Sequence, residues 1–433
     1  MKLKRLLVQN YKSLRKVKFE PDGFAALLGP NGAGKSNFAD AIDFLSYVYR
    51  HGLEHAVARK GGYENIAFRQ ERRSKSAIVF QIEVEASKGD VGRLNRSPLL
   101  GKSAHKIESL SLIHLFSFKA VGTTIKSEFK VLEERITLRS EHCDSKSSSV
   151  LEETIIDRDV HGKLHFTINK TAVLAPLLDR VRYFIRDFSS EESPILAPEQ
   201  LALGSPVLSS ILFSTFIRPL AQMSVYKLSS ELSRAAGVPT PNPLLAITGE
   251  NLPAVIDWLK RHEPQSWKAV METMRDISPQ LEDISVQYLH TKTLGLFFKE
   301  KNVGRLWTAE DVSDGTIRSL AVLVTSVDPR ASLLLIEEPE NSVHPWIIKV
   351  LIERLRKVSE HKTVIVTSHS PVLIDVIAPK EAWVVYKHRG ATALKHLPDM
   401  DADLESHWEL GRYKLSEYLD SGAITEVVPG GLT

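Results

Sequence analysis

Cysteine is almost absent from this chain of 433 residues, which contains only Cys143. One thiol excludes an intramolecular disulfide framework and a multi-cysteine zinc site, and such low usage is typical of a reducing cytoplasm. No stretch approaches the roughly 18 apolar residues of a membrane-spanning helix. The basic N-terminus, MKLKRLLVQNYKSL, is interrupted by polar residues before an apolar signal region can form. We therefore expect a cytoplasmic protein with no membrane partner.

Internal repeats, low-complexity tracts and sustained heptads are also missing. The composition, 43% hydrophobic and 25% charged, is that of a globular protein with one large core or two domains. The formal net charge is only +3, but Met1–Ala120 carries 21 Lys and Arg against 11 Asp and Glu. This basic part is compatible with a solvated surface and equally with a phosphate-bearing partner.

A glycine-rich segment follows a short apolar run near the N-terminus. Phe24–Leu28 reads FAALL, which predicts a strand, and GPNGAGKS follows at Gly29–Ser36. The next apolar residues recur at helical spacing; they are Phe38, Ala41, Ile42, Leu45 and Val48. Strand, glycine-rich loop and helix are the context in which G-x-x-x-x-G-K-[ST] binds phosphate.

The chemistry expected of this loop is specific. Glycines let backbone N–H groups curl around phosphate oxygens, and the helix N-terminus adds its positive dipole end. Lys35 would reach the β- and γ-phosphates, and the Ser36 hydroxyl would bind Mg²⁺. The expected ATP-binding residues of the loop are Asn31, Gly32, Ala33, Gly34, Lys35, Ser36 and Asn37.

Two adjacent glutamates end a second apolar run, LLLIEEP. Leu333–Ile336 is continuously apolar, as expected of a parallel strand buried on both faces. Ligands bind at the carboxyl ends of such strands. We expect Glu337 to support the Mg²⁺ ion and Glu338 to orient and deprotonate the attacking water.

Two further segments complete the predicted site. DVSDGTIRSL places Ser313 and Gly315 just before an apolar helical run, which makes a second anion-binding helix N-terminus. KTVIVTSHSPVLID contains a buried strand at Val364–Val366, and His369 follows it. There the imidazole could donate a hydrogen bond to a γ-phosphate.

Together these segments resemble the ATP-binding-cassette (ABC) class of ATPases, in its RecF/SMC/OLD-like branch. GPNGAGKS resembles Walker A, VSDGT the signature motif, LLLIEEP Walker B and VTSHSP the switch histidine. The opening LLVQNYKSLRKVKFEP resembles the first strand of that branch, which puts Lys12 and Ser13 where the family often contacts nucleotide. The likeness is good over Met1–Arg50 and Trp307–Tyr386.

Several positions depart from the family pattern. Asp314 stands at a glycine of the signature, Glu337 replaces the usual aspartate, and His344 occupies the place of the D-loop aspartate. Related stand-alone ATPases share these variations, which argue against a transporter. The glutamine that would complete the Mg²⁺ ligands is Gln70 or Gln81, and Gln70 is preferred.

The resemblance implies an α/β fold: a P-loop NTPase with an ABC-type ATPase head and an inserted helical lid. The expected division is 1–195 (N-terminal lobe with a β-rich insert), 196–300 (lid) and 301–433 (C-terminal lobe). It further implies a Mg²⁺-dependent ATPase that forms a head-to-tail dimer or a higher oligomer, in which Ser313 and Gly315 act on the ATP of the partner subunit. ATP would then hold the dimer together.

The middle of the chain is expected to be β-rich and then helical. Phe80–Glu85, Ile107–Phe118, Phe129–Leu138 and Leu164–Ile168 are expected strands, and the serine-rich Ser140–Ser149 is an expected loop. The pattern is helical over Pro198–Asp283, broken by a linker at Gly237–Pro243. The basic runs at Ala58–Lys75 and Gly92–Lys106 have two possible interpretations. They would be exposed loops, or they would contact a DNA or RNA backbone.

Two functions remain open. The first is the sensor subunit of an anti-phage system that controls a separate effector, a nuclease or toxin, because the sequence after His369 is too short for a nuclease domain. The alternative is a DNA-binding repair or recombination ATPase of the RecF/SMC type.

Overall fold

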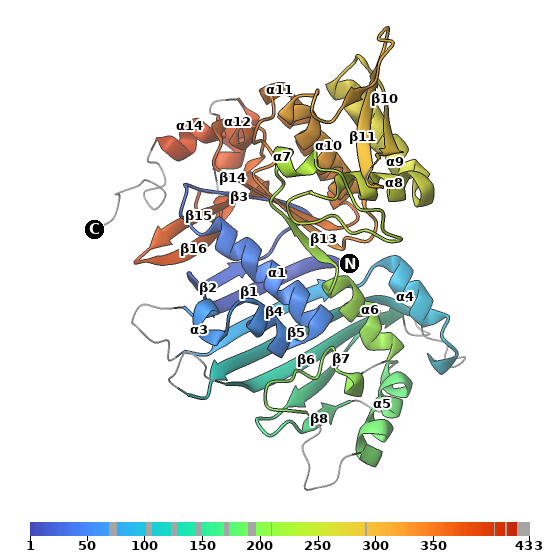
Figure 1. Cartoon of the computed structure of the whole chain (residues 1–433). Helices are drawn as coiled ribbons and strands as arrows, with labels where there is room; N and C mark the ends of the chain where they lie inside the picture. The colour runs from blue at the N-terminus through green and yellow to red at the C-terminus, as the bar shows by residue number, and fades with distance from the viewer. Residues whose placement is uncertain are drawn as a thin grey trace. The chain divides into compact units, whose positions relative to one another are not determined.

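The computed structural model of the chain is shown in Figure 1. It describes residues 1–68, 76–100, 106–122, 128–143, 149–168, 173–188, 196–208, 210–290, 292–401, 403–411 and 414–421. The chain forms two compact units. Unit 1 comprises Met1–Asp22, Asp40–Met223 and Tyr386–Leu394; unit 2 comprises Gly23–Ala39, Ser224–Val385 and Lys395–Thr433. Each unit combines segments distant in sequence, and the three-part division at 195 and 300 stays a prediction.

Unit 2 contains a parallel sheet in the order β15-β3-β14-β13, followed by β9. The strands are β15 (Ala382–His388), β3 (Phe24–Leu28), β14 (Thr363–Ser368), β13 (Leu333–Glu337) and β9 (Met223–Tyr226). β14 pairs in parallel with both β3 and β13. All residues of β3 and β14 are buried, as parallel strands covered on both faces require. The three strands expected from their apolar runs are confirmed.

Helices α10 (Asp314–Val327) and α11 (Pro345–Ser359) pack on this sheet. Nearly the whole length of α10 after its first turn is buried, because α9 also covers it. The other helices of unit 2 are α7 (Ser230–Ser233), α8 (Leu252–His262), α9 (Pro264–Ile277), α12 (Pro371–Ile374), α13 (Leu404–Glu409) and α14 (Leu415–Asp420).

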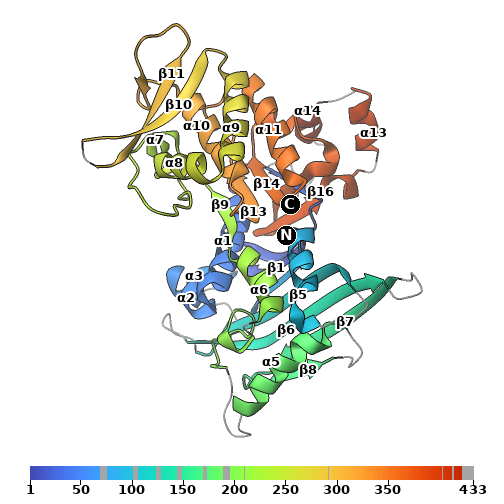
Figure 2. The ribbon, with the colours of Figure 1, turned by 90° about the vertical axis from the view of Figure 1, so that its right-hand side faces the viewer.

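A three-stranded antiparallel sheet accompanies α8 and α9, and Figure 2 shows its hairpin beside them. Its strands are β10 (Leu281–Tyr288), β11 (Leu294–Glu300) and β12 (Trp307–Thr308). Helices occupy much of the region predicted to be helical, and Gly237–Pro243 contains no helix, as expected. The hairpin was not predicted, and β10 begins before that region ends.

Unit 1 contains an antiparallel sheet in the order β8-β7-β6-β5-β4-β1-β2. Its strands are β1 (Lys2–Tyr11), β2 (Leu14–Phe19), β4 (Ile78–Glu85), β5 (Ile107–Ala120), β6 (Phe129–Cys143), β7 (Ser149–Arg158) and β8 (Leu164–Thr167). β16 (Ala391–His396) joins β2 through Thr392 and Leu14. Buried and half-buried residues alternate along β4, so that one face of this sheet is buried and the other is more exposed to solvent.

Helix α1 (Lys35–His51) begins in unit 2 and continues into unit 1. In unit 1, the Phe44 ring packs 5.3 Å from Tyr11 and 5.5 Å from Phe80, centroid to centroid, and Phe116 and Phe118 extend this aromatic cluster along β5. The remaining helices are α2 (Leu53–Arg59), α3 (Tyr63–Ile66), α4 (Lys88–Asn95), α5 (Ala175–Phe188) and α6 (Ile211–Leu220). In the described part of the chain, no helix is both long and apolar enough to cross a bilayer.

The loop expected at Ser140–Ser149 is wrong at both ends. Ser140–Cys143 belong to β6, and Ser149 begins β7, which was not predicted; Ser140 pairs with Glu152 and Cys143 with Ser149. Residues 144–148 lie outside the described part. Polar residues enter these strands because pairing with neighbouring strands outweighs their low β-propensity.

Candidate active site

The glycine-rich segment forms a tight loop between β3 and α1. Gly32 and Gly34 adopt φ angles of 78° and 111°, which favour glycine. A Cβ at Gly29 would lie 2.1 Å from the carbonyl oxygen of Val385, so no side chain fits there. Inside the loop, Ala33 N–H donates to Pro30 O at 3.3 Å. The loop is therefore compact, with its backbone curled at the N-terminus of a long helix.

Lys35 lies at the start of α1 and is 6% exposed. Its ammonium donates to the carbonyl oxygens of Gly29 and Pro30, at 2.5 and 3.0 Å. Burial lowers its pKa, whereas the nearby carboxylates of Glu338, Glu340 and Glu337 act in the opposite direction. An ammonium has three donors, so one remains for a phosphate oxygen.

Ser36 and Glu337 meet although they come from opposite ends of the chain. Ser36 Oγ donates to Glu337 Oε2 at 2.5 Å. Glu337 ends β13, two strands from β3 in the sheet, and the two side chains therefore converge at the carboxyl edge of parallel strands. The longer arm of glutamate at this position reaches the loop hydroxyl directly.

The carboxylate, the backbone N–H and the carbonyl of Glu338 all have polar partners. Its carboxylate lies 3.2 Å from His369 Nδ1 through Oε1 and accepts from Asn341 Nδ2 at 2.8 Å through Oε2. Its N–H donates to Thr367 O at 3.0 Å, and its carbonyl accepts from Arg318 at 2.6 Å. The φ angle of Glu338 is 48°, an unfavourable value for glutamate. Such local strain is typical of functional positions.

Arg318, on α10, links the signature segment to these glutamates. Its guanidinium donates to the carbonyl oxygens of Glu337 and Glu338, and also to that of Leu228. The residue is 4% exposed, and burial lowers its pKa. Sequence reasoning missed Arg318; the available signal was a charge inside the apolar run IRSLAVLV.

The signature segment begins α10. Ser313 is exposed and caps this helix, accepting from Thr316 N at 3.2 Å. A Cβ at Gly315 would lie 2.8 Å from Ser342 O, which explains glycine there. Asp314, at a family glycine position, forms an ion pair at 2.5 Å with Arg234. The ion pair with Arg234 therefore compensates the negative charge of Asp314 at this position of the signature.

Of the remaining predicted nucleotide contacts, Asn31 and Asn37 belong to unit 2, and Lys12 and Ser13 belong to unit 1. Lys12 Nζ lies 2.6 Å from Asp40 Oδ2, and Ser13 Oγ lies 2.7 Å from Thr392 Oγ1. Gln81 lies inside β4, and Gln70 falls outside the described residues. The structure thus brings together Lys35, Ser36, Glu337, Glu338 and His369, and the roles of all the predicted site residues stay predictions. His344 is exposed at the start of α11.

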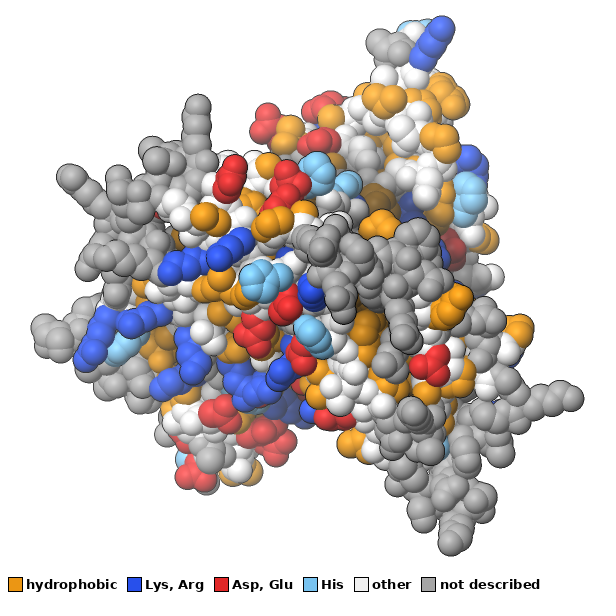
Figure 3. Space-filling model, turned by 90° about the horizontal axis from the view of Figure 1, so that it is seen from below, with side chains coloured by type: hydrophobic (Ala, Val, Ile, Leu, Met, Phe, Trp, Pro, Cys, Tyr) orange, Lys and Arg blue, Asp and Glu red, His pale blue; other side chains and the backbone are white. Residues whose placement is uncertain are grey.

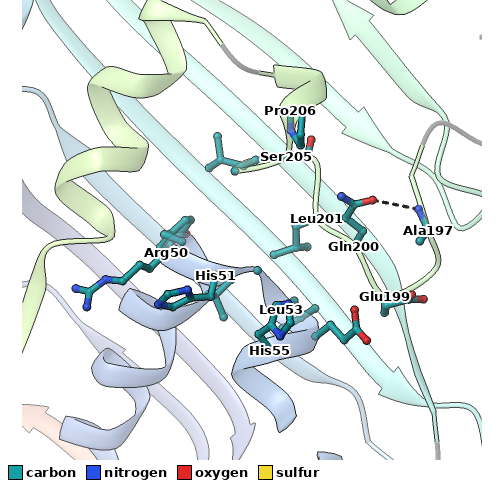
Figure 4. A pocket seen from close by; sticks show the side chains of 16 residues that line it. Arg50, His51, Leu53, His55, Ala197, Glu199, Gln200, Leu201, Ser205 and Pro206 are labelled. Carbon is teal, nitrogen blue, oxygen red and sulfur yellow. Dashed lines mark hydrogen bonds between the residues drawn. The ribbon is translucent and has the colours of Figure 1, made fainter. Parts of the chain in front are cut away.

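Unit 1 contains a separate pocket of about 440 Å³, shown in Figure 4. It lies between the end of α1, the start of α2 and the loop at Ala197–Pro206. Buried Glu134 supports this loop by accepting from the N–H groups of Ala202 and Leu203 at 2.7 and 2.9 Å.

Figure 3 shows Lys and Arg side chains clustered on one face, with acidic and histidine side chains between them.

The donor set of unit 2 suits magnesium and nucleotide. Mg²⁺ prefers oxygen ligands and usually takes only one or two from the protein, the rest coming from phosphates and water. The touching Ser36 hydroxyl and Glu337 carboxylate supply such oxygens. The compact loop, buried lysine and helix N-terminus supply the donors that a polyphosphate needs.

A phosphate loop after β3 and a carboxylate pair after β13, two strands apart at one edge of a parallel sheet, together with a signature helix, are the features of an ABC-class ATPase head of the RecF/SMC branch. The model of the family described as "AAA domain, putative AbiEii toxin, Type IV TA system" matches residues 24–375. The chain belongs to that family.

Short segments of curated proteins are also similar. A chromosome partition protein Smc from Koribacter versatilis is 50% identical over 48 residues, which cover 10% of this chain and 4% of that protein. A DNA replication and repair protein RecF from Nocardioides sp. is 28% identical over 102 residues, 23% of this chain and 24% of that protein. The RecF of Paenarthrobacter aurescens is 32% identical over 101 residues, covering 22% and 25%. The chain thus spans a quarter or less of these relatives.

Solved structures give weak matches. An SmcHead bound to the C-winged helix domain of ScpA aligns over 91% of this chain and 97% of its own, at 14% identity and a TM-score of 0.46. The SMC head domain from Thermotoga maritima aligns over 92% and 99%, at 12% identity and a TM-score of 0.39.

Proposed function

We propose that this protein binds and hydrolyses ATP with Mg²⁺, at the carboxyl edge of the sheet in unit 2. The contact between Ser36 and Glu337, beside the pair formed by Glu338 and His369, carries the proposal. It unites a phosphate loop with a carboxylate suited to activate water. Membership of an ATPase family supports the same reaction.

Each residue has a distinct role in this proposal. Lys35 and the loop N–H groups hold the phosphates, and Ser36 and Glu337 hold Mg²⁺, which neutralises charge on the phosphate oxygens. Glu338 orients the attacking water and takes its proton. His369, in contact with Glu338, donates a hydrogen bond to the transferred phosphoryl group. Asn341 and Arg318 keep Glu338 in place through its side chain and carbonyl.

The second part of the proposal is an ATP-bridged dimer. Ser313 is exposed at the N-terminus of α10, a helix of 14 residues that presents N–H groups and a positive dipole end. The N-terminus of α10 would contact the ATP that is bound by a second copy of the chain. A signature that closes over the neighbouring nucleotide makes the assembly depend on ATP, and hydrolysis releases it.

The biological task we propose is the control of a separate effector in an anti-phage system. The family description names a putative toxin of a toxin–antitoxin system, and such a two-component system supports a role together with a second protein. ATP-dependent dimerisation would supply the switch. The effector would be a nuclease or toxin in another chain.

A DNA-binding repair ATPase is the second candidate. The similarity of short segments to RecF and Smc favours it, as does the basic character of Met1–Ala120. Exposed Lys4, Arg15, Lys16 and Lys18 on β1 and β2 would contact phosphates.

One experiment separates the two tasks. Tagged Glu338→Gln protein is isolated from cells with ATP present, with and without nuclease treatment, and its partners are identified by mass spectrometry and nucleic-acid staining. A stoichiometric protein that survives nuclease supports the effector. Recovery of DNA alone, lost when ATP is omitted, supports the repair function and contradicts the first.

A further inference from the structure

The third glutamate of the segment EEPE, Glu340, differs from the other two in its burial. Glu337 and Glu338 are half-buried, whereas Glu340 is only 7% exposed. Burying a carboxyl group is costly unless its oxygens find partners. One oxygen, Oε1, accepts a hydrogen bond from the Ser368 hydroxyl, and Oε2 has no hydrogen-bond partner in the described part of the structure. Such an unfavourable placement calls for a reason.

Ser368 explains what the contact achieves. Its hydroxyl donates to Glu340 and accepts from the N–H of Ser370 at 3.0 Å. The bond from Ser370 spans His369, the residue between the two serines, and the bond to Glu340 anchors the same hydroxyl. His369 is exposed, and its Nδ1 lies 3.2 Å from Glu338 Oε1. The Glu340–Ser368 contact therefore fixes the backbone that carries the imidazole.

We propose that Glu340 is a positioning residue: its buried carboxyl group holds Ser368 and thereby keeps His369 against Glu338. This inference rests on the proposed ATP hydrolysis for its effect on rate, but not for its effect on geometry. Glu340 also begins the turn that continues from Glu338, because Val343 N–H donates to its carbonyl oxygen at 3.0 Å. One side chain thus connects the end of β13 to the end of β14.

The surrounding charges fit this role. Burial raises the pKa of Glu340, and the hydrogen bond from Ser368 opposes that shift. The Glu340 carboxylate in turn favours the charged forms of Lys35 and Arg318 by raising their pKa values against the effect of burial. An apolar residue of similar size would fill the space but could not hold Ser368.

The first test is kinetic. Steady-state ATPase rates and ATP dissociation constants are measured for Glu340→Ala, Glu340→Gln and His369→Ala, with Glu353→Ala on the exposed face of α11 as a control. We expect Glu340→Ala to lower kcat about 10- to 100-fold, as loss of supporting contacts commonly does, with ATP affinity nearly unchanged. A glutamine side chain keeps an acceptor oxygen, so Glu340→Gln should retain most of the rate. In a His369→Ala background, Glu340→Ala should have no further effect.

The second test does not depend on hydrolysis. NMR spectra of protein with ¹³C-labelled histidine report the His369 imidazole directly, and His369→Ala assigns its signal. Glu340→Ala should shift and broaden this signal, Glu340→Gln should leave it close to that of the wild type, and the signal of His344 should stay unchanged in both. A His369 signal unaffected by Glu340→Ala overturns the inference. A response without any ATPase activity in the wild type overturns the proposed function instead.

Discussion

The hydroxyl oxygen of Ser36 lies 2.5 Å from Oε2 of Glu337, although 301 positions separate the two residues. Ser36 lies in the first turn of α1, which follows β3 through the glycine-rich loop, and Glu337 ends β13. β14 lies between these strands and pairs in parallel with both. The contact exists because parallel strands present their carboxyl ends at one edge of the sheet.

Removal of this hydroxyl tests the proposed magnesium site. We expect Ser36→Ala to raise the Mg²⁺ concentration needed for half-maximal ATPase activity about tenfold, because one of the few protein ligands is lost. Activity measured across a magnesium titration gives the value. Ser285→Ala, on β10, is the matched control. An unchanged magnesium requirement would contradict the assignment of Ser36.

The buried ammonium of Lys35 should dominate nucleotide affinity. Lys35→Ala is expected to weaken ATP binding about 10- to 100-fold, since a charge-assisted contact is worth about 1.5–3 kcal/mol. Isothermal titration calorimetry with ATP measures this loss. Lys349→Ala removes an exposed lysine from α11 and should bind like the wild type. Equal affinities for the two variants would argue against the phosphate loop.

Glu338 should affect turnover and leave binding intact. Glu338→Gln keeps the size of the side chain but cannot accept a proton, so kcat should fall about 10²- to 10⁴-fold. Because ATP persists, light scattering should show a larger dimer fraction than in the wild type. Glu353→Gln serves as the control on α11. If Glu338→Gln hydrolyses ATP at the wild-type rate, another group is the base.

Gly29 has no room for a side chain, independently of its role with phosphate. Its Cβ would lie 2.1 Å from Val385 O, a backbone atom that cannot easily move. We expect Gly29→Ala to lower the free energy of unfolding by about 1–3 kcal/mol, as overpacking does. Chemical denaturation measures it. Gly304 has open space around its Cβ position, so Gly304→Ala should change stability by less than about 0.5 kcal/mol.

The buried Lys362 should make the free energy of unfolding depend on pH in the alkaline range. Burial lowers its pKa to about 8, and Asp328 only partly opposes this shift; its ammonium donates to Asp328 O at 2.7 Å. Between pH 8 and the unfolded pKa of about 10.4, the unfolded chain holds a proton that the folded protein has released. The Lys362 contribution to folding should therefore rise with pH across this window, on the order of 1–3 kcal/mol.

The measurement compares wild type with Lys362→Met. Unfolding free energies are determined by denaturant titration at pH 7.5 and pH 10. The wild type should gain stability relative to the variant as pH rises, and Lys349→Met should follow the wild type. A constant difference between wild type and Lys362→Met would show that Lys362 titrates normally.

The sequence by itself determined the elements whose chemistry is local. A glycine-rich loop needs glycine where φ is positive, and buried parallel strands need unbroken apolar runs, so the P-loop, β3, β13 and β14 were all predictable. The positions of Glu337, Glu338 and His369 followed from their places at or just after the ends of such strands.

Only the tertiary structure decided which side chains meet at this edge. Arg318 contacts the glutamate carbonyls because α10 packs on β13, and Glu340 contacts Ser368 because β13 pairs with β14. No motif or spacing in the sequence predicts either contact, because both depend on how separate elements pack. The β10–β11 hairpin and β7 were missed for the same reason: strand pairing, more than local propensity, creates them.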